Sequence, residues 1–204
     1  MKIICIGRNY SDHAKELGNA VPKKPLFFLK PDSAILPKKQ AFFYPEFTKD
    51  IHYELELVIK INRLGKHIEE RFAKDYYKEI SIGLDLTARD LQQECKEKGL
   101  PWEIAKGFDG SAIIGTKFIP KSNFENQNDI TFHLLKNGEK VQIGNSKDMI
   151  FSVDKIIAYV SQFMTLKIGD LIYTGTPVGV GPIQIGDKLE GFLEDEKLLE
   201  LRVK

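Results

Sequence analysis

The amino-acid sequence predicts a β-rich α+β fold with a few short helices. Segments with strand signals, which are short apolar runs rich in β-branched or aromatic residues, outnumber segments with helical periodicity. The two kinds of segment do not alternate regularly, which disfavours a doubly wound parallel sheet. The chain has 204 residues, 42% hydrophobic and 29% charged, a composition typical of a folded protein with a sizeable core. We expect one domain over residues 1–204.

Strand signals recur along the chain. The segment 2–6 is apolar and β-branched, 25–29 and 41–44 are aromatic runs next to proline, and 54–61 is a long strand candidate. Further strands are expected at 111–115, 131–136, 140–143, 171–174 and 188–203, with turns at Gly169-Asp170 and Gly186-Asp187.

Helices are expected at 11–17, 68–77, 88–98 and 153–164. Each opens on a residue suited to cap a helix or on an acidic first turn, as Ser152 and Asp154 do for the last of them. The third helix is expected to end at Gly99, which is followed by Pro101.

The charge balance and the cysteine count exclude several classes of protein. The 30 Lys and Arg residues against 29 Asp and Glu give a formal net charge of +1, so nucleic-acid partners are not expected. Cys5 and Cys95 lie far apart and match no metal-ligand spacing, which argues against a disulfide or zinc site and for a reducing cytoplasm. No signal peptide or membrane-spanning run is apparent, so we expect a cytoplasmic protein that does not bind membranes.

The segment His52-Tyr53-Glu54-Leu55-Glu56-Leu57 gives the first sign of a functional site. Successive side chains of a strand point to opposite faces, so His52, Glu54 and Glu56 share one face. The two carboxylates would lie about 7 Å apart at the backbone, near enough to reach one cation. The alternative is an amphipathic strand whose polar face lies in solvent.

Asp85 offers a third carboxylate. It follows the apolar, strand-like run 80–84 and precedes a helix, a position where carboxylates often serve functional sites. The alternative role is that of a helix cap or turn residue. Three carboxylates without sulfur suit a hard cation such as Mg²⁺ or Mn²⁺, which leaves coordination positions for water or substrate.

Further motifs occur in order along nearly the whole chain. They are Gly7-Arg8-Asn9-Tyr10 with His13 and Glu16, Phe28-Leu29-Lys30-Pro31, Asp85-x-Thr87-Ala88-Arg89-Asp90-x-Gln92, Lys98-Gly99-Leu100-Pro101-Trp102, Ala105-Lys106, Met149-Ile150-Phe151, and Thr174-Gly175-Thr176-Pro177-x-Gly179-Val180-Gly181-Pro182. Together with the acidic segment, they resemble the fumarylacetoacetate hydrolase family, in particular its small single-domain acylpyruvate hydrolases and oxaloacetate decarboxylases. The resemblance implies a mixed β-sandwich or barrel-like catalytic domain and a homodimer.

The resemblance also implies roles for individual residues. Glu54, Glu56 and Asp85 would bind Mg²⁺ or Mn²⁺, which can stabilise the enolate of a chelated 2-oxo acid. Lys106, by itself more simply a surface lysine, would be a catalytic positive charge beside the enolate or the substrate carboxylate. The residues expected to bind substrate are Arg8, Arg89, Gln92 and Thr176, the last through its hydroxyl or its backbone amide.

His13 and Glu16 lie three residues apart and would share one side of a helix. By themselves they are most simply an exposed pair, but the resemblance implies a dyad that deprotonates water for attack on the distal carbonyl. Residues 11–25 are expected to form a mobile lid that closes over the substrate.

One further residue keeps two interpretations, and two other features are expected to have structural roles. His52 is equally well explained as a partner of the metal ligands or as a structural histidine. Trp102 is assigned to packing, and the run 96–98 to a solvated helix end.

The predicted function is metal-dependent hydrolysis of an acylpyruvate to pyruvate and a carboxylic acid. Oxaloacetate decarboxylation or keto–enol tautomerisation, which needs no water attack, is the runner-up, followed by isomerisation of a hydroxy-dienedioate. The alternative from another class is a non-enzymatic binding module whose carboxylates are surface decoration.

Overall fold

A computed structural model describes residues 1–16 and 21–204, apart from the side chains of residues 13–15. Its largest sheet has seven strands in the order β2-β1-β11-β4-β5-β7, with β8 beside β5. These strands are β1 (Ile3–Gly7), β2 (Leu26–Lys30), β4 (Leu55–Ile61), β5 (Tyr77–Asp85), β7 (Ala112–Ile114), β8 (Ile119–Pro120) and β11 (Leu171–Tyr173). The pairing of β1 with β11 is parallel and the other described pairings in this sheet are antiparallel, as expected for an α+β fold.

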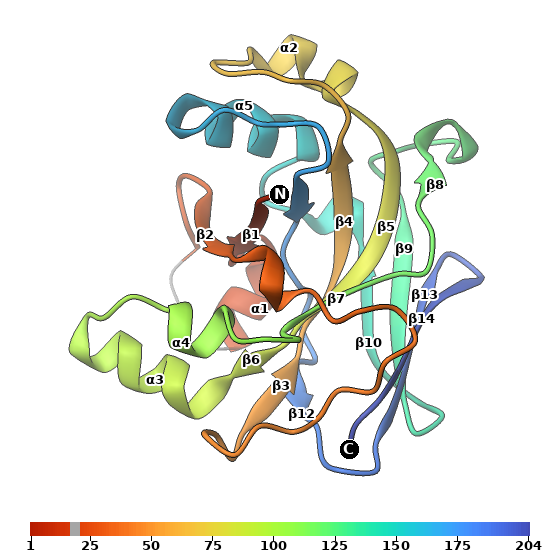
Figure 1. The fold of residues 1–204 in the computed structure, drawn as a ribbon. Helices are drawn as coiled ribbons and strands as arrows, with labels where there is room; N and C mark the ends of the chain where they lie inside the picture. Colours follow the sequence, from red (N-terminus) through yellow and green to blue (C-terminus); the bar gives the residue numbers. More distant parts are fainter. Residues whose placement is uncertain (17–20) are drawn as a thin grey trace.

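Two smaller sheets complete the β-structure (Figure 1). A four-stranded sheet has the order β10-β9-β13-β14, and a three-stranded sheet has the order β12-β3-β6. Their strands are β3 (Ile51–Tyr53), β6 (Thr87–Ala88), β9 (Thr131–Lys136), β10 (Glu139–Asn145), β12 (Gly181–Pro182), β13 (Lys188–Leu193) and β14 (Glu196–Arg202). Phe132 and Leu189 of the four-stranded sheet share one apolar core with Leu57 and Ile82 of the largest sheet. The two sheets therefore enclose the core between them.

The helices are short and lie at the margins of the sheets. They are α1 (Ser11–Glu16), α2 (Glu70–Ala73), α3 (Arg89–Lys98), α4 (Glu103–Lys106) and α5 (Val153–Phe163), with 3₁₀ turns η1 (Asp32–Ala34), η2 (Lys74–Tyr76), η3 (Lys121–Asn123) and η4 (Ser146–Asp148). The capping predictions are confirmed, since Ser152 Oγ accepts from Lys155 N at 3.2 Å and Gly99 ends α3 at φ 64°. Helices α2 and α5 lie together at the top of Figure 1, and α3 and α4 at its lower left.

Several predicted segments differ from the observed ones. Segment 41–44 is wrong as a strand, because it contributes one isolated bridge from Phe42 to Val203. The helix expected at 68–77 is only α2 and η2, and Tyr77 already begins β5, whose pairing with β4 overrides the local helical pattern. Segment 188–203 is a hairpin that turns at Glu194, which has a φ of 49°.

The strand predicted at 54–61 is observed from Leu55 to Ile61, so that Glu54 lies just before it. Glu54 lies between β3, which belongs to the three-stranded sheet, and β4, which belongs to the largest sheet. Because β4 and β5 are antiparallel, the start of β4 meets the end of β5, and Asp85 N donates to Glu54 O at 2.9 Å. The change of sheet therefore places Glu54 directly beside Asp85.

Asp170 anchors the first strand and gives a prediction of pH-dependent stability. Its carboxylate is 1% exposed and accepts from the backbone N–H groups of Lys2 and Lys167, each at 2.8 Å, while Lys2 Nζ lies 2.5 Å away. Burial alone would raise the pKa of Asp170, but the hydrogen bonds and the charge of Lys2 outweigh it and lower this pKa. The ionised form is thus the one that stabilises the fold.

We expect Asp170→Asn to lower the free energy of unfolding by about 2 kcal/mol at pH 7, because an amide loses the charged hydrogen bonds. A lowered folded-state pKa gives stability that is present above the unfolded pKa, near 4, and is lost as pH falls through the folded value. Urea denaturation should therefore show a difference in the free energy of unfolding between wild type and Asp170→Asn at pH 7, and this difference should disappear in more acid solution. A difference that is independent of pH would contradict this account.

Candidate active site

Three buried carboxylates meet at the start of β4 and the end of β5. Glu54, Glu56 and Asp85 are 6%, 1% and 1% exposed, and each offers an oxygen within 4.8 Å of the other two. Glu54 and Glu56 lie two residues apart and point to the same side, as the alternation of strand side chains predicts. Asp85 joins them from the neighbouring strand. These burials exclude a solvent-facing strand, and Asp85 does not cap α3, whose N-cap is Ala88.

Glu56 is a member of the cluster whose pKa is raised by its surroundings. Burial, and then the negative charges of Asp85 and Glu54, raise the pKa of the Glu56 carboxyl well above its ordinary value. Gly175 N donates to Glu56 Oε2 at 2.6 Å, which opposes this rise in pKa. Gly175 has a φ of 100°, and a Cβ there would lie 2.7 Å from that of Asn9, so the motif around Thr174 requires glycine at this position.

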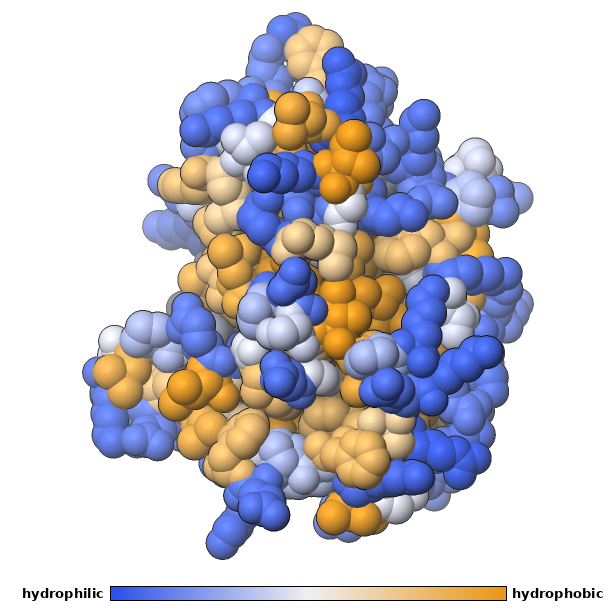
Figure 2. Space-filling model, in the orientation of Figure 1, coloured by the Kyte–Doolittle hydropathy of each residue, from blue (hydrophilic) through white to orange (hydrophobic). Residues whose placement is uncertain are grey.

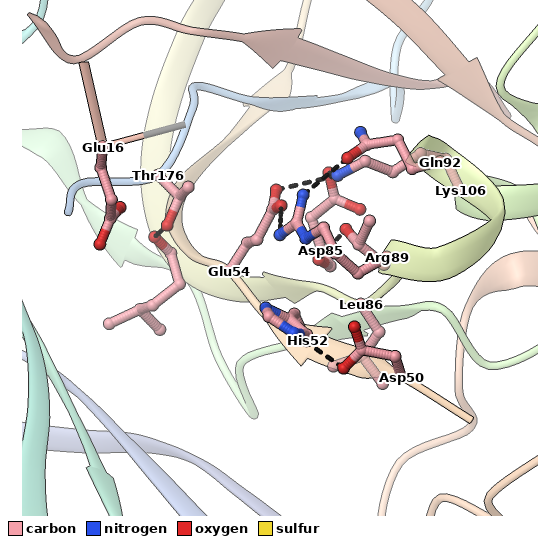
Figure 3. Close-up of polar contacts among 12 residues, drawn as sticks. Glu16, Asp50, His52, Glu54, Asp85, Leu86, Arg89, Gln92, Lys106 and Thr176 are labelled. Atoms are coloured by element: carbon pink, nitrogen blue, oxygen red, sulfur yellow. Dashed lines mark hydrogen bonds and ion pairs between the residues drawn. The ribbon is translucent and has the colours of Figure 1, made fainter. Parts of the chain in front are cut away.

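Three cations lie beside the carboxylates, and Figure 3 shows two of them, Arg89 and Lys106. Lys106 Nζ lies 2.8 Å from both Glu54 Oε2 and Asp85 Oδ2, and Arg89 Nη2 lies 2.6 Å from Glu54 Oε1. Lys106 is 2% exposed, which excludes the surface lysine that its sequence context alone suggests. Burial would lower the pKa of Lys106, but the charges of Asp85 and Glu54 outweigh it and raise this pKa. The ammonium group is thus held in its charged form.

Lys30 is the third cation, and the sequence analysis assigned it no role. Its side chain is fully buried, with Nζ 2.7 Å from Asp85 Oδ1 and donating to Leu86 O at 3.2 Å and Ser111 O at 3.0 Å. The sequence feature that could have indicated its burial is its position, because Lys30 ends the otherwise apolar strand β2 directly before Pro31. Such a lysine needs a buried partner, which Asp85 provides.

The donor set suits a divalent cation. Carboxylate oxygens without sulfur or imidazole are the ligands of hard ions such as Mg²⁺ and Mn²⁺. Asp85 Oδ1 forms an ion pair with Lys30 Nζ at 2.7 Å, and this buried oxygen accepts no hydrogen bond in the described part of the chain. A buried oxygen that accepts no hydrogen bond can coordinate a cation, and the cation would reduce the repulsion among the three carboxylates.

A cavity opens beside the cluster and collects the residues expected to bind substrate. Its atom-free space is about 430 Å³, including solvent at its mouth, and Arg8, Arg89, Gln92 and Thr176 all line it. Arg8 adopts a φ of 59°, a backbone conformation that costs energy for a residue with a Cβ and is typical of functional sites. The structure therefore brings together the substrate-binding residues that the resemblance implies.

Two further residues line the cavity against expectation. Lys96 faces the cavity and does not form part of a solvated helix end, and its Nζ lies 5.9 Å from the centre of the Trp102 ring. Trp102 packs on Phe28, as predicted, and also lines the cavity. Lys98 does behave as the sequence predicts, because it is exposed and pairs with Glu94 at 2.6 Å. The two lysines differ because residues 89, 92 and 96 share one side of a helix and residue 98 does not.

Gln142, which the sequence analysis did not single out, fixes the position of Thr176. Its Oε1 accepts from Leu55 N at 3.0 Å, and its Nε2 donates to Thr176 Oγ1 at 3.0 Å and to Pro177 O at 3.1 Å. Thr176 Oγ1 in turn donates to Leu55 O at 2.9 Å. Because β4 begins at Leu55, this amide supports the chain between the two metal-ligand candidates Glu54 and Glu56.

The proposed water-activating dyad is only partly described. Glu16, at the end of α1, accepts from Gly179 N at 3.1 Å, which ties this helix to the loop that carries Thr176. The side chain of His13 lies outside the described residues, as do residues 17–20 of the predicted lid. The dyad and the lid therefore stay predictions.

His52 pairs with Asp50 and not with the carboxylate cluster. Its Nε2 lies 2.9 Å from Asp50 Oδ1, and the ring is 18% exposed (Figure 3). Burial, and then the charge of Arg89, lower the pKa of His52. Of its two open interpretations, the structure favours that of a structural histidine.

Comparisons with known proteins find similar proteins over nearly the whole length of this chain. A model of the C-terminal domain of fumarylacetoacetate hydrolase matches residues 2–204. The mitochondrial oxaloacetate tautomerase of Bos taurus is 41% identical over 99% of this chain and 91% of its own. A fumarylpyruvate hydrolase from Pseudomonas aeruginosa, solved with Mn²⁺ and pyruvate, is 37% identical and superposes with a TM-score of 0.93 over 100% of this chain and 89% of its own.

A third reaction occurs among the similar structures. The 2-hydroxyhepta-2,4-diene-1,7-dioate isomerase from Mycobacterium marinum is 34% identical and superposes with a TM-score of 0.85. The match covers 99% of this chain and 73% of that one. Tautomerisation, hydrolysis and isomerisation are thus all found on this fold, so the fold by itself does not select the reaction.

Proposed function

Because the chain belongs to the fumarylacetoacetate hydrolase family, we propose that it is a divalent-metal-dependent enzyme that acts on small 2-oxo acids by stabilising their enolates. Oxaloacetate keto–enol tautomerisation is the first candidate reaction and hydrolysis of an acylpyruvate the second. The observation that carries the proposal is the buried cluster of Glu54, Glu56 and Asp85 at the base of a cation-lined cavity. A non-enzymatic binding module has no use for this arrangement, and the relatives are enzymes.

The order of the two reactions differs from that expected from sequence. The pair His13 and Glu16 favours hydrolysis, because both are suited to activate water. The relatives favour tautomerisation, since the bovine protein named for that reaction is 41% identical over nearly the full length of both chains. Both reactions require stabilisation of the enolate of a 2-oxo acid, that of oxaloacetate in the first and that of pyruvate in the second.

Metal binding is part of the proposal. Glu54, Glu56 and Asp85 would hold one Mg²⁺ or Mn²⁺, and the ion would supply Lewis-acid chemistry by drawing electron density from the substrate carbonyl. The Mn²⁺ in the Pseudomonas aeruginosa structure supports a divalent ion without selecting between the two.

The cations of the chain bind and orient the substrate. Arg89 is held against the cavity wall by Glu54 and by Gln92, whose Oε1 accepts from Nη1 at 2.6 Å, and its guanidinium is the group to bind a substrate carboxylate. Lys106 places a fixed positive charge where the enolate develops its negative charge. The Thr176 hydroxyl proton is already donated to Leu55 O, so we assign substrate contact to the backbone amide of Thr176.

Two further predictions accompany this function. We expect a homodimer, as the family resemblance implies, and Figure 2 shows several apolar patches on one face of the molecule, one of them near its middle. No described helix is long and apolar enough to cross a membrane. A cytoplasmic location stays a prediction, and the bovine relative is mitochondrial by name.

An assay panel tests the proposal. Enol-oxaloacetate decay, oxaloacetate decarboxylation, and cleavage of acetylpyruvate and fumarylpyruvate are measured with Mg²⁺ or Mn²⁺ and after chelation. We expect metal-dependent conversion of at least one substrate, lost in Glu54→Ala. His13→Ala should abolish hydrolysis and leave decarboxylation or tautomerisation, since only hydrolysis needs activated water. Full activity in Glu54→Ala, or after chelation, would overturn the metal assignment.

A further inference from the structure

One face of helix α3 runs along the cavity wall. Arg89, Gln92 and Lys96 are spaced at i, i+3 and i+7, so they lie in a row on one side of the helix, and all three line the cavity. With a rise of 1.5 Å per residue, the backbone of Lys96 lies about 10 Å along the axis from that of Arg89. The row therefore leads away from the carboxylate cluster toward the outer part of the cavity.

Lys96 carries a positive charge that the described chain leaves without a carboxylate partner. The side chain is half-buried, and within the described ranges no carboxylate oxygen lies within 4.0 Å of its Nζ. Burial lowers the pKa of Lys96, and the neighbouring charges of Arg89 and Arg8 lower it further. Lys96, Arg89 and Arg8 thus line one cavity, where a bound anion would reduce the repulsion between their charges.

Lys98, two residues further along, shows what an ordinary surface lysine does on this helix. Its side chain is 61% exposed and pairs with Glu94 at 2.6 Å. Lys96 instead lies over the ring of Trp102, which is itself part of the cavity wall. The contact restrains its ammonium group beside the cavity.

We propose that Lys96 binds a second carboxylate of the substrate, remote from the 2-oxo acid group, and so makes the enzyme selective for dicarboxylic 2-oxo acids. This inference rests on the proposed function. The 2-oxo acid end of the substrate belongs at the carboxylate cluster with Arg89, and the distal carboxylate extends along α3 to Lys96. The middle of the substrate then lies against Phe28 and Trp102, whose rings are 5.9 Å apart at the cavity wall.

The test compares substrates with and without the distal carboxylate. In Lys96→Met, KM for oxaloacetate or fumarylpyruvate should rise about tenfold or more, the cost of one charged hydrogen bond, with kcat changed little. KM for acetylpyruvate, which lacks the distal carboxylate, should stay within about twofold. Lys98→Met is the matched control and should leave all substrates unchanged, and Lys96→Arg should retain most of the selectivity.

A binding measurement separates failure of this inference from failure of the proposed function. In Mn²⁺, 2-oxoglutarate should raise the melting temperature of the wild type more than pyruvate does, and Lys96→Met should remove the difference. This comparison needs no turnover, so it decides the role of Lys96 even if none of the assayed substrates is converted. Equal effects of Lys96→Met on dicarboxylic and monocarboxylic ligands, or no wild-type preference for 2-oxoglutarate, would overturn the inference.

Discussion

Asp85→Asn is expected to lower kcat/KM by about 10³-fold and to abolish Mn²⁺ binding. Asp85 offers one of three candidate ligand oxygens, and its Oδ1 has no hydrogen-bond partner among the described residues. An amide keeps the size of the side chain but removes a negative charge from the site of a divalent cation. Loss of about 4 kcal/mol of transition-state stabilisation corresponds to the expected thousandfold effect.

Mn²⁺ binding should be measured directly, by electron paramagnetic resonance of free Mn²⁺, because the substitution also removes a partner of Lys30 and Lys106 and changes the melting temperature by itself. Asp195→Asn is the control, since Asp195 is exposed in the turn between β13 and β14. Unchanged Mn²⁺ affinity in Asp85→Asn would show that the carboxylate cluster is not the metal site.

Lys30→Met is expected to lower the free energy of unfolding of the metal-free protein by about 3 kcal/mol. Removing one partner of a buried ion pair leaves the other charge without compensation, which typically costs about 3 to 5 kcal/mol. Here Asp85 keeps Lys106 at 2.8 Å, which places the expected value at the lower end. The backbone oxygens of Leu86 and Ser111 also lose a donor.

Urea denaturation in chelator measures the effect, and saturating Mn²⁺ should restore part of the loss, since the ion supplies positive charge to the same carboxylates. Lys38→Met is the matched control, because Lys38 Nζ also donates to a backbone oxygen, Thr116 O at 2.9 Å, but is exposed. Its effect should stay below about 0.5 kcal/mol. If Lys30→Met is as stable as Lys38→Met in chelator, the buried ion pair contributes nothing to stability.

The parts of the fold and site that follow local rules could be predicted from sequence. Helix α3 ends at a glycine in the left-handed region, and strand β9 has the predicted bounds, because both patterns depend on neighbouring residues. Glu54 and Glu56 fall on one side for the same reason. The motifs around them pointed to the family that the comparisons identify.

The remaining parts depend on contacts between distant segments. Lys30 and Lys106 are buried only because β2 and α4 meet β5 in space, and no local pattern distinguishes a buried lysine from an exposed one. Gln142 lies on β10 of the four-stranded sheet, so its hydrogen bond to Leu55 of the largest sheet depends on how the two sheets pack. The prediction of a helix at 68–77 is wrong for the same reason. Tyr77 pairs with Ile61 of the neighbouring strand, so β5 already begins at the residue where the helix was expected to end.

The bulge in β10 makes the length of that strand matter to the reaction. Lys140 pairs with Leu135 and Gln142 with Leu134, so Val141 is an extra residue on one side of the ladder. Removing it would turn the following side chains to the opposite face and withdraw the Gln142 amide from Leu55 and Thr176. The number of residues in β10 thus influences the positions of the acidic ligand candidates, although its sheet contains none of them. Insertions and deletions in β10 should therefore be tolerated less well than substitutions on its exposed side.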